Sequence, residues 1–214
     1  MLNNEQIEKN FEEYISLLLS TKREGIEKLV DWLKSKDTKV APASSKYHSA
    51  YAGGLVEHSL KVYKRLKDLV NVVYPKFVND GVETKEVDNY VQKYSDETLI
   101  IVALLHDISK VNYYDIQYRN VKENEIWVQK PFYAIKNDEF IYGTHGLNSL
   151  YIAKTFVKLS YEEELAILHH MGGFDYTDGV QENKLIPKIY GKSPLALLLH
   201  EADLMSTFLD ENRE

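Results

Sequence analysis

An apolar run, residues 99–105, leads directly into a histidine and a carboxylate, His106 and Asp107. Ser95 is placed to cap a helix that carries this run. Adjacent residues of a helix point about 100° apart, so one cation at the helix edge can contact both side chains. Imidazole and carboxylate are good ligands for Mn, Fe, Co and Zn. Taken alone, the pair also fits a helix end at which Asp107 and Lys110 are merely solvated, so the other histidines decide between the two interpretations.

Composition limits the class of protein. With 214 residues the chain fits one domain, residues 1–214, and its 44% apolar and 28% charged residues are those of an ordinary globular protein. The net charge of −7 argues against a broad surface for long duplex nucleic acid. It leaves nucleotides and short oligonucleotides open, because bound cations add positive charge locally. The absence of cysteine excludes disulfides, zinc ribbons and thiol nucleophiles.

No segment indicates export or a membrane. The N-terminus is polar and acidic, unlike a signal peptide, and no apolar stretch approaches the roughly 20 residues that cross a bilayer. We therefore expect a soluble, cytoplasmic protein without a membrane partner. The sequence leaves a homo-oligomer open.

Helical periodicity predicts a mostly helical fold. Residues 1–46 are read as N-terminal helical packing elements, with a second helix over about 22–36. A loop over residues 37–54 is rich in serine and contains proline and a glycine pair, and a long helix over residues 55–73 follows it. The fold class is therefore predicted as an all-α helical bundle.

Capping signals place the later helices. A helix is expected after Gly143, and Ser160 with Glu163 forms a capping box that opens the next helix. After a glycine pair at residues 172–173, a polar loop is expected to run to Ser193, which caps the last helix with a proline at its first position.

The segment 112–142 differs from the rest because it is rich in aromatic residues. Alternating apolar residues at 132–135 and 140–142 flank a polar stretch at 136–139, which predicts a small β-hairpin inserted into the bundle. Its aromatic side chains favour structural packing over stacking on a base, and the sequence leaves open a lid, a dimer contact or plain scaffold.

Candidate metal ligands recur on five separate predicted helices, on or beside apolar faces. A single core histidine is often satisfied by a backbone carbonyl, and a buried ionised aspartate is costly unless it is paired or bound to metal. Seven such residues beside apolar faces are explained more simply by metal binding than by a separate hydrogen-bonded role in the core for each one. The candidates are His58, His106, Asp107, His145, His169, His170 and Asp203.

The order His, His-Asp, His, His-His, Asp resembles the HD-domain superfamily of metal-dependent phosphohydrolases, in particular the branch whose extra histidines hold a second metal. Residues 47–60, 168–170 and 199–203 are similar to the HD domain of bacterial 3′–5′ exoribonucleases. The resemblance spans about residues 47–203, and its motifs are specific in combination. It implies that residues 1–214 form a single HD domain, with residues 47–210 as the HD core.

The resemblance also implies roles for the candidates. Lys110 matches the lysine of the His-Asp-x-Gly-Lys motif, which contacts the substrate phosphate, and Ser109 replaces the glycine of that motif. Asp107 matches the residue that bridges both metals. The first metal would be held by His58, His106, Asp107 and Asp203, and the second by Asp107, His145, His169 and His170.

The expected function is hydrolysis of a phosphate ester by a water activated between two divalent cations, with Asp107 and Lys110 as catalytic residues. The mixed ligand set favours Mn, Fe or Co over Mg, with Zn or Ni also open. A phosphodiester of a nucleotide or short oligonucleotide is the favoured substrate. Alternatives are a nucleoside mono- or triphosphate phosphohydrolase, a di-iron oxygenase of the HD type, and a non-catalytic nucleotide sensor.

Two departures from the family narrow the substrate. The Gly-Tyr-Pro signature of cyclic-di-GMP phosphodiesterases is absent, and residues 1–46 are too short for the oligonucleotide-binding barrel of the exoribonucleases. His48 is expected at the surface or behind a ligand, while His200 faces either the site or the core. A basic cluster on the helix 55–73 is read as a solvated face; it comprises Lys61, Lys64, Arg65 and Lys67.

Overall fold

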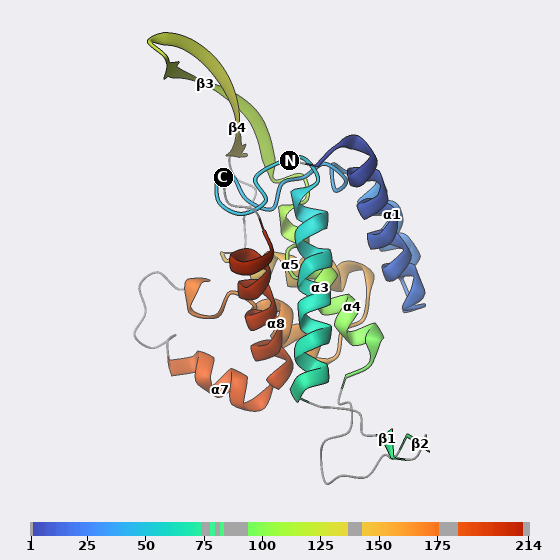
Figure 1. The fold of residues 1–214 in the computed structure, drawn as a ribbon. Coiled ribbons are helices and arrows are strands. Elements are labelled where there is room, and N and C mark those ends of the chain that lie inside the picture. Colours follow the sequence, from blue (N-terminus) through green and yellow to red (C-terminus); the bar gives the residue numbers. More distant parts are fainter. Residues whose placement is uncertain are drawn as a thin grey trace.

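The computed structural model describes residues 2–73, 78–79, 82–83, 94–136, 143–175 and 184–211. Its described part is mostly helical, and the helices pack into one bundle from which a two-stranded hairpin projects (Figure 1). The α-helices are α1 (Asn4–Ser20), α2 (Ile26–Lys34), α3 (Gly54–Val73), α4 (Asp96–Leu105), α5 (His145–Phe156), α6 (Tyr161–Leu168), α7 (Leu185–Lys192) and α8 (Pro194–Met205). Short helical turns are η1 (Ile108–Lys110), η2 (Gly172–Asp175) and the π-helical η4 (Ser206–Asp210).

Helix α4 is the centre of the bundle. Residues 99–105 are all buried, so the apolar run has no solvent-facing side. Helices α1, α3, α5 and α6 pack around it. The hydroxyl of Tyr14 on α1 donates a 2.6 Å hydrogen bond to the carbonyl oxygen of Leu104, which fixes the end of α4 just before His106. The packing of α4 and this hydrogen bond therefore fix the position of His106 and Asp107, which follow the helix.

Local signals predict most of the helix boundaries correctly. Ser95 caps α4, and Ser160 with Glu163 forms the expected capping box on α6. The second helix is shorter than expected, because Gly25 at its N-cap adopts a left-handed φ of 85°. Arg23, just before that turn, pairs with Glu163 at 2.8 Å and so joins the N-terminal helices to α6.

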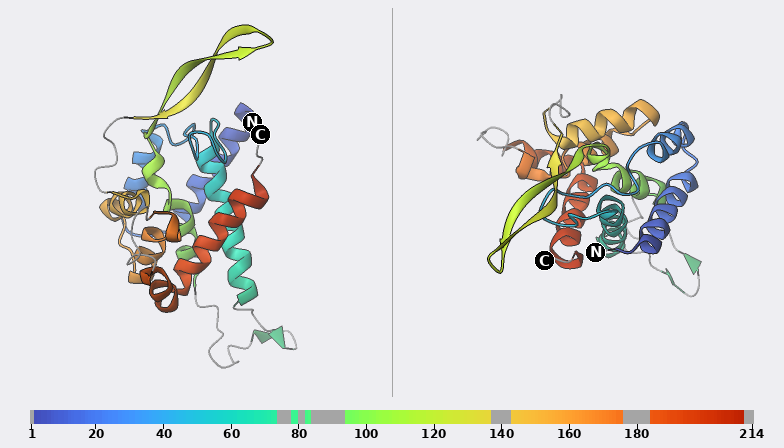
Figure 2. Two further views of the ribbon diagram at one scale, coloured as in Figure 1. Left: turned by 90° about the vertical axis from the view of Figure 1, so that its left-hand side faces the viewer. Right: turned by 90° about the horizontal axis from the view of Figure 1, so that it is seen from above.

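The β-hairpin is longer than the sequence predicts and turns at a different place. Strand β3 (Tyr114–Glu123) pairs antiparallel with β4 (Ile126–Ile135) along its whole length. Asn124 and Glu125 connect the strands, and both have a positive φ, as a type I′ turn requires. Figure 2 shows this hairpin projecting clear of the helices.

This pairing corrects the expected hairpin. Residues 132–135 pair with β3, not with residues 140–142, so the predicted turn at 136–139 is wrong. Residues 140–142 lie outside the described residues. A second correction concerns the polar loop expected before Ser193, which contains helix α7. A very short antiparallel pair, β1 (Val78–Asn79) and β2 (Val82–Glu83), completes the described elements.

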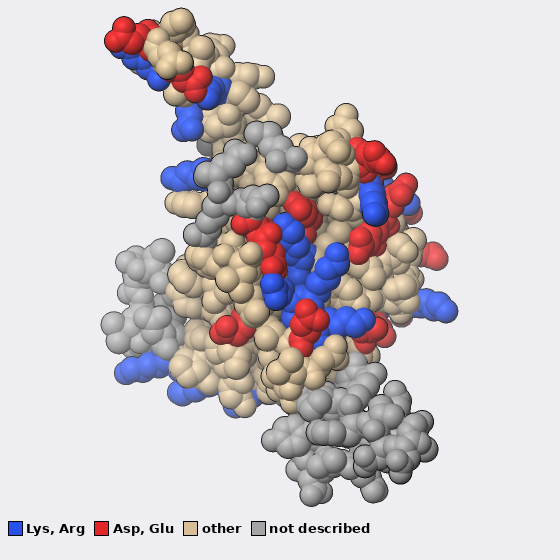
Figure 3. All heavy atoms as spheres, in the orientation of Figure 1, with Lys and Arg blue, Asp and Glu red and all other residues tan. Residues whose placement is uncertain are grey.

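Basic side chains gather on the face of α3, where acidic side chains flank them (Figure 3). Each has a carboxylate partner: Lys61 pairs with Glu57, Lys64 with Glu13, Arg65 with Asp210 and Lys67 with Asp96. The cluster is therefore internally compensated. Among the described helices none is both long and apolar enough to cross a membrane.

Candidate metal centre

Six of the seven predicted ligands converge at one buried place in the bundle. They come from five separate segments, and their donor atoms fall into overlapping groups whose members lie within 4.8 Å of one another. The six are His58 on α3, His106 at the end of α4, Asp107 before η1, His145 at the start of α5, His170 after α6 and Asp203 on α8.

One half of the centre lies between α3, α4 and α8. Nε2 of His58 lies 3.2 Å from Oδ1 of Asp203 and 3.6 Å from Oδ2 of Asp107. Nε2 of His106 lies 3.3 Å from Nε2 of His58 and 3.4 Å from the same Asp107 oxygen. Two nitrogens and two carboxylates therefore face one small volume.

The other half uses the second oxygen of Asp107. Nε2 atoms of His145 and His170 each lie 3.5 Å from Oδ1 of Asp107 and 3.0 Å from each other. No described donor reaches hydrogen-bonding geometry with Oδ1, although it is buried. Asp107 therefore stands between two histidine pairs, with one oxygen turned to each.

Helix α5 reaches the centre because two small residues allow it. A Cβ on Gly146 would lie 2.5 Å from the carbonyl oxygen of Leu168, so only glycine lets the start of α5 approach the end of α6. Ser109 donates a 3.1 Å hydrogen bond to the carbonyl oxygen of His145 and accepts one of 2.9 Å from Ser149. Ser109 thus holds His145 in place.

Backbone carbonyls orient two of the histidines from behind. Nδ1 of His106 donates to the carbonyl oxygen of Ala103, and Nδ1 of His170 donates to that of Ile167, each at 2.8 Å. These bonds keep a proton on Nδ1 and turn Nε2 into the centre, as is usual for metal-bound histidine.

A carboxylate that the sequence analysis missed orients His58. Nδ1 of His58 lies 2.6 Å from Oε1 of Glu211, and Ser49 donates a 2.6 Å hydrogen bond to Oε2 of the same carboxylate. The Glu211 side chain is fully buried. No sequence pattern connects Glu211 to a histidine 153 positions earlier, so only the fold reveals the contact.

The charges of the centre favour a cation. Burial raises the pKa of Asp203, but the hydrogen bond with His58 and the charges of the neighbouring histidines together outweigh burial and hold the pKa below its usual value. Burial likewise lowers the pKa of His58, yet Asp203 and Glu211 raise it to about 10. Burial and the charge of His170 lower the pKa of His145 to about 3, which keeps that imidazole neutral. The carboxylates therefore remain charged and draw positive charge to the centre.

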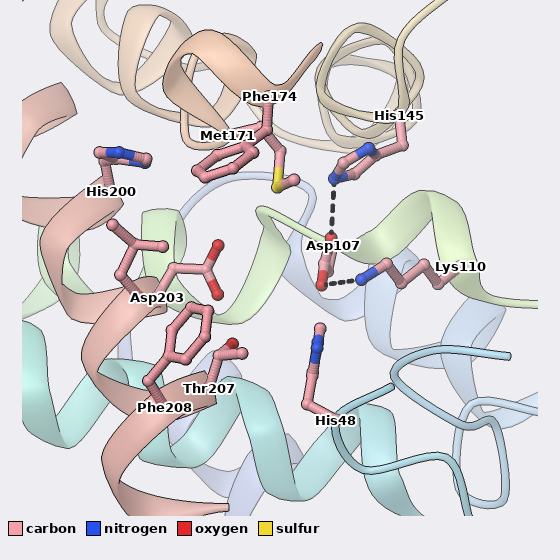
Figure 4. A pocket seen from close by; sticks show the side chains of 11 residues that line it. His48, Asp107, Lys110, His145, Met171, Phe174, His200, Asp203, Thr207 and Phe208 are labelled. Atoms are coloured by element: carbon pink, nitrogen blue, oxygen red, sulfur yellow. Dashed lines mark hydrogen bonds and ion pairs between the residues drawn. The ribbon is translucent and has the colours of Figure 1, made fainter. Parts of the chain in front are cut away.

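A cavity of about 200 Å³ opens over the centre. Figure 4 shows Lys110 and His145 reaching Asp107 on one side of this cavity, with Phe174 and Phe208 on the other. Nζ of Lys110 lies 2.6 Å from Oδ2 of Asp107. Burial lowers the pKa of Lys110, but the charge and hydrogen bond of Asp107, with the charges of Tyr114 and Asp203, together outweigh burial and raise the pKa, so the amine stays protonated.

Three further histidines have defined places. His48 lines the cavity with its ring 5.0 Å from that of His58. His200 also lines the cavity, and its Nδ1 donates a 2.6 Å hydrogen bond to the carbonyl oxygen of His170. It therefore both faces the site and holds the segment that carries His170. His169 is buried but belongs to none of the donor groups among the described residues.

The residues fit a metal ion. The Nε2 atoms of His145 and His170 lie 3.0 Å apart, and those of His58 and His106 lie 3.3 Å apart, so each pair requires a proton or a cation between its nitrogens. The ionised Asp107 offers Oδ1, which has no hydrogen-bond partner among the described residues, to the same space. The donors are buried and held from behind, which is the arrangement of a preformed metal site. The cluster can therefore hold a metal ion.

Comparison with protein-family profiles, with curated proteins and with solved structures finds no match to this chain. The interpretation of the centre therefore depends on its own geometry and chemistry.

Proposed function

We propose that the chain is a metal-dependent phosphohydrolase of the HD type that cleaves a phosphodiester of a nucleotide or short oligonucleotide. The observation that carries this proposal is the position of Asp107. Its two oxygens face different histidine pairs, while Lys110 approaches one of them from the cavity. A carboxylate in this position suits a bridge between two cations.

The proposed ligands divide at Asp107. His58, His106 and Asp203 would hold one cation, and His145 with His170 the other. Bound divalent cations supply an activated water and offset the charge that develops on phosphoryl oxygens. The nitrogen-rich donor set favours Mn, Fe or Co over Mg.

The residues around the centre suit a nucleotide, in which a phosphate is joined to a sugar and a base. Lys110 carries a positive charge at the edge of the cavity and would bind a phosphoryl oxygen. Four apolar side chains also line the cavity: Met171, Phe174, Leu204 and Phe208. Phe174 and Phe208 are 69% and 57% exposed, so a base or sugar can pack against them.

The test is metal content of protein purified without chelator, together with hydrolysis of bis-p-nitrophenyl phosphate in added Mn. About two metals per chain and Mn-stimulated hydrolysis support the proposal. One metal with hydrolysis of phosphomonoesters alone would favour a nucleotide phosphatase. Two irons with dioxygen consumption and no hydrolysis would favour an oxygenase, and nucleotide binding without turnover a sensor.

A further inference from the structure

The hairpin of β3 and β4 is an arm without a supporting core. Each strand has ten residues, so the arm is roughly 30 Å long. None of its residues belongs to the hydrophobic core of the bundle. A two-stranded hairpin is only marginally stable by itself in water. The arm instead leaves large side chains exposed, among them Ile116, Tyr118 and Trp127.

The register divides the side chains of the arm into two different faces. Residues directly opposite each other share a face, so the pairs alternate between the two sides. The first, here called the aromatic face, contains Tyr114, Ile116, Tyr118, Asn120, Lys122, Trp127, Gln129, Pro131, Tyr133 and Ile135. Asp115 and Glu123 lie on the opposite face, so the aromatic face carries no acidic residue.

Aromatic rings follow one another along this face. Of its five cross-strand pairs, four contain a tyrosine or tryptophan, and successive pairs are about 7 Å apart. Tyr118 is 66% exposed and Trp127 68% exposed. Lys122 stands opposite Trp127, and the amides of Asn120 and Gln129 stand opposite each other. The face thus combines stacking surfaces with hydrogen-bond donors and one cation.

The aromatic face begins four residues after Lys110, which lines the cavity over the metal centre. Tyr114 is the first residue of this face and of strand β3, and its ring lies 6.4 Å from that of Tyr133 on the same face. Burial raises the pKa of Tyr114 to about 12, with a smaller lowering effect of the Lys110 charge and a raising effect of the Asp107 charge. The phenol therefore interacts electrostatically with both Lys110 and Asp107.

We propose that the aromatic face binds single-stranded nucleic acid and leads it to the metal centre. Bases would stack on Tyr133, Tyr118 and Trp127, as on other sequence-tolerant stacking surfaces. Duplex does not fit, since its bases are already stacked on one another. Figure 3 shows the arm with its charged side chains gathered mainly towards its tip, and the basic face of α3 is already neutralised by its own carboxylates. The arm is thus the better candidate surface for a nucleic-acid strand.

This inference rests on the proposed function only for the cleavage that follows binding, so binding is measured directly. The probes are fluorescein-labelled oligo-dT and oligo-U of about 12 nucleotides, read by fluorescence anisotropy in chelator, where no turnover occurs. Tyr118→Ala and Trp127→Ala should each weaken binding about tenfold. Ile126→Ala is the matched control, because Ile126 is 66% exposed on the opposite face, and it should leave the affinity within about twofold.

The outcomes separate the two proposals. If wild-type protein binds neither oligonucleotide, or if the two aromatic variants bind as well as wild type, the arm inference is overturned whether or not bis-p-nitrophenyl phosphate is hydrolysed. Arm-dependent binding without any hydrolysis would retain the arm inference and overturn the proposed function. Light scattering provides the remaining check: a dimer that both aromatic variants dissociate, with unchanged oligonucleotide affinity, would assign the face to a second copy of the chain.

Discussion

Oε1 of Glu211 accepts a 2.6 Å hydrogen bond from Nδ1 of His58. This contact joins the residue after η4 to helix α3. Carboxylates that hold a ligand histidine in this way typically change metal affinity by 10- to 100-fold. Glu211 is therefore expected to act on the metal through His58 without touching it.

Glu211→Gln should weaken Mn binding about tenfold, because the amide is a poorer acceptor and does not stabilise a positive charge on the imidazole. Isothermal titration with Mn measures the change. The control is Asp210→Asn, which removes the carboxylate partner of Arg65 at the neighbouring position and leaves the centre intact. Equal affinities of the Glu211 variant and wild type would contradict the role.

Ser109→Ala should loosen His145, because it removes both the hydrogen bond to the His145 carbonyl oxygen and the acceptor for Ser149. We expect the metal content to fall from two ions towards one at limiting Mn, with the fold kept. Metal analysis after gel filtration measures the content. Thr155→Ala is the control, since its hydroxyl bonds only within α5. Full loading of the Ser109 variant at the same Mn concentration would refute this expectation.

Asp107→Ala should abolish hydrolysis of bis-p-nitrophenyl phosphate, because the proposed bridge between the two halves of the centre is lost. His106→Ala should do the same. The helical signal in far-ultraviolet circular dichroism should remain, since the core around α4 does not depend on either side chain. Full activity of the Asp107 variant would be incompatible with the mechanism.

Lys110→Ala should lower kcat by about 100-fold, the usual effect of losing one group that stabilises developing negative charge. Mn should still bind, and with higher affinity, because a cation 2.6 Å from Asp107 is removed. Steady-state kinetics at saturating Mn separate the two effects. Lys64→Ala, a change at a 65% exposed side chain on α3, should alter neither quantity. A Lys110 variant with wild-type kcat would exclude the lysine from catalysis.

Acidification should weaken the link between Arg23 and Glu163. Burial raises the pKa of Glu163, but the hydrogen bonds from Arg23 and from the Ser160 backbone, with the charge of Arg23, together outweigh burial and hold the pKa below the usual 4.5. A depressed pKa means that the link contributes stability above about pH 4.5, and that the contribution is lost as the pH falls through the lower, folded-state pKa. Glu163→Gln should therefore cost about 2 kcal/mol of unfolding free energy at pH 7 and less below pH 4. Urea denaturation at both pH values tests this; a cost independent of pH would contradict it.

The sequence predicted what short-range patterns control. Ser95, Ser160 and Glu163 act within one turn of their helices, so they could be recognised locally and are confirmed. The hairpin turn was misplaced because Glu125 stands where a type I′ turn usually has glycine, whereas the polar stretch at 136–139 contains Asn137 and Asp138, two common turn residues.

Longer-range features were beyond the sequence. Helix α7 was missed because it contains Pro187 and Gly191, residues that normally interrupt helices. The identity of the ligand candidates came from their order and a family resemblance, whereas their convergence depends on the packing of five separate segments. Glu211 and the hydrogen bonds of Ser109 were missed because such contacts are formed only when distant elements meet.

The dispersed origin of the ligands has a thermodynamic consequence. Because His58 and Asp203 meet only after the bundle has assembled, the unfolded chain offers a cation little more than isolated side chains. A metal ion that binds the folded chain alone adds RT ln(1 + [M]/Kd) to its stability, about 2.7 kcal/mol at a hundredfold excess over Kd. A chain that binds such an ion would therefore unfold more often, and be exposed to proteases more often, when the ion is scarce.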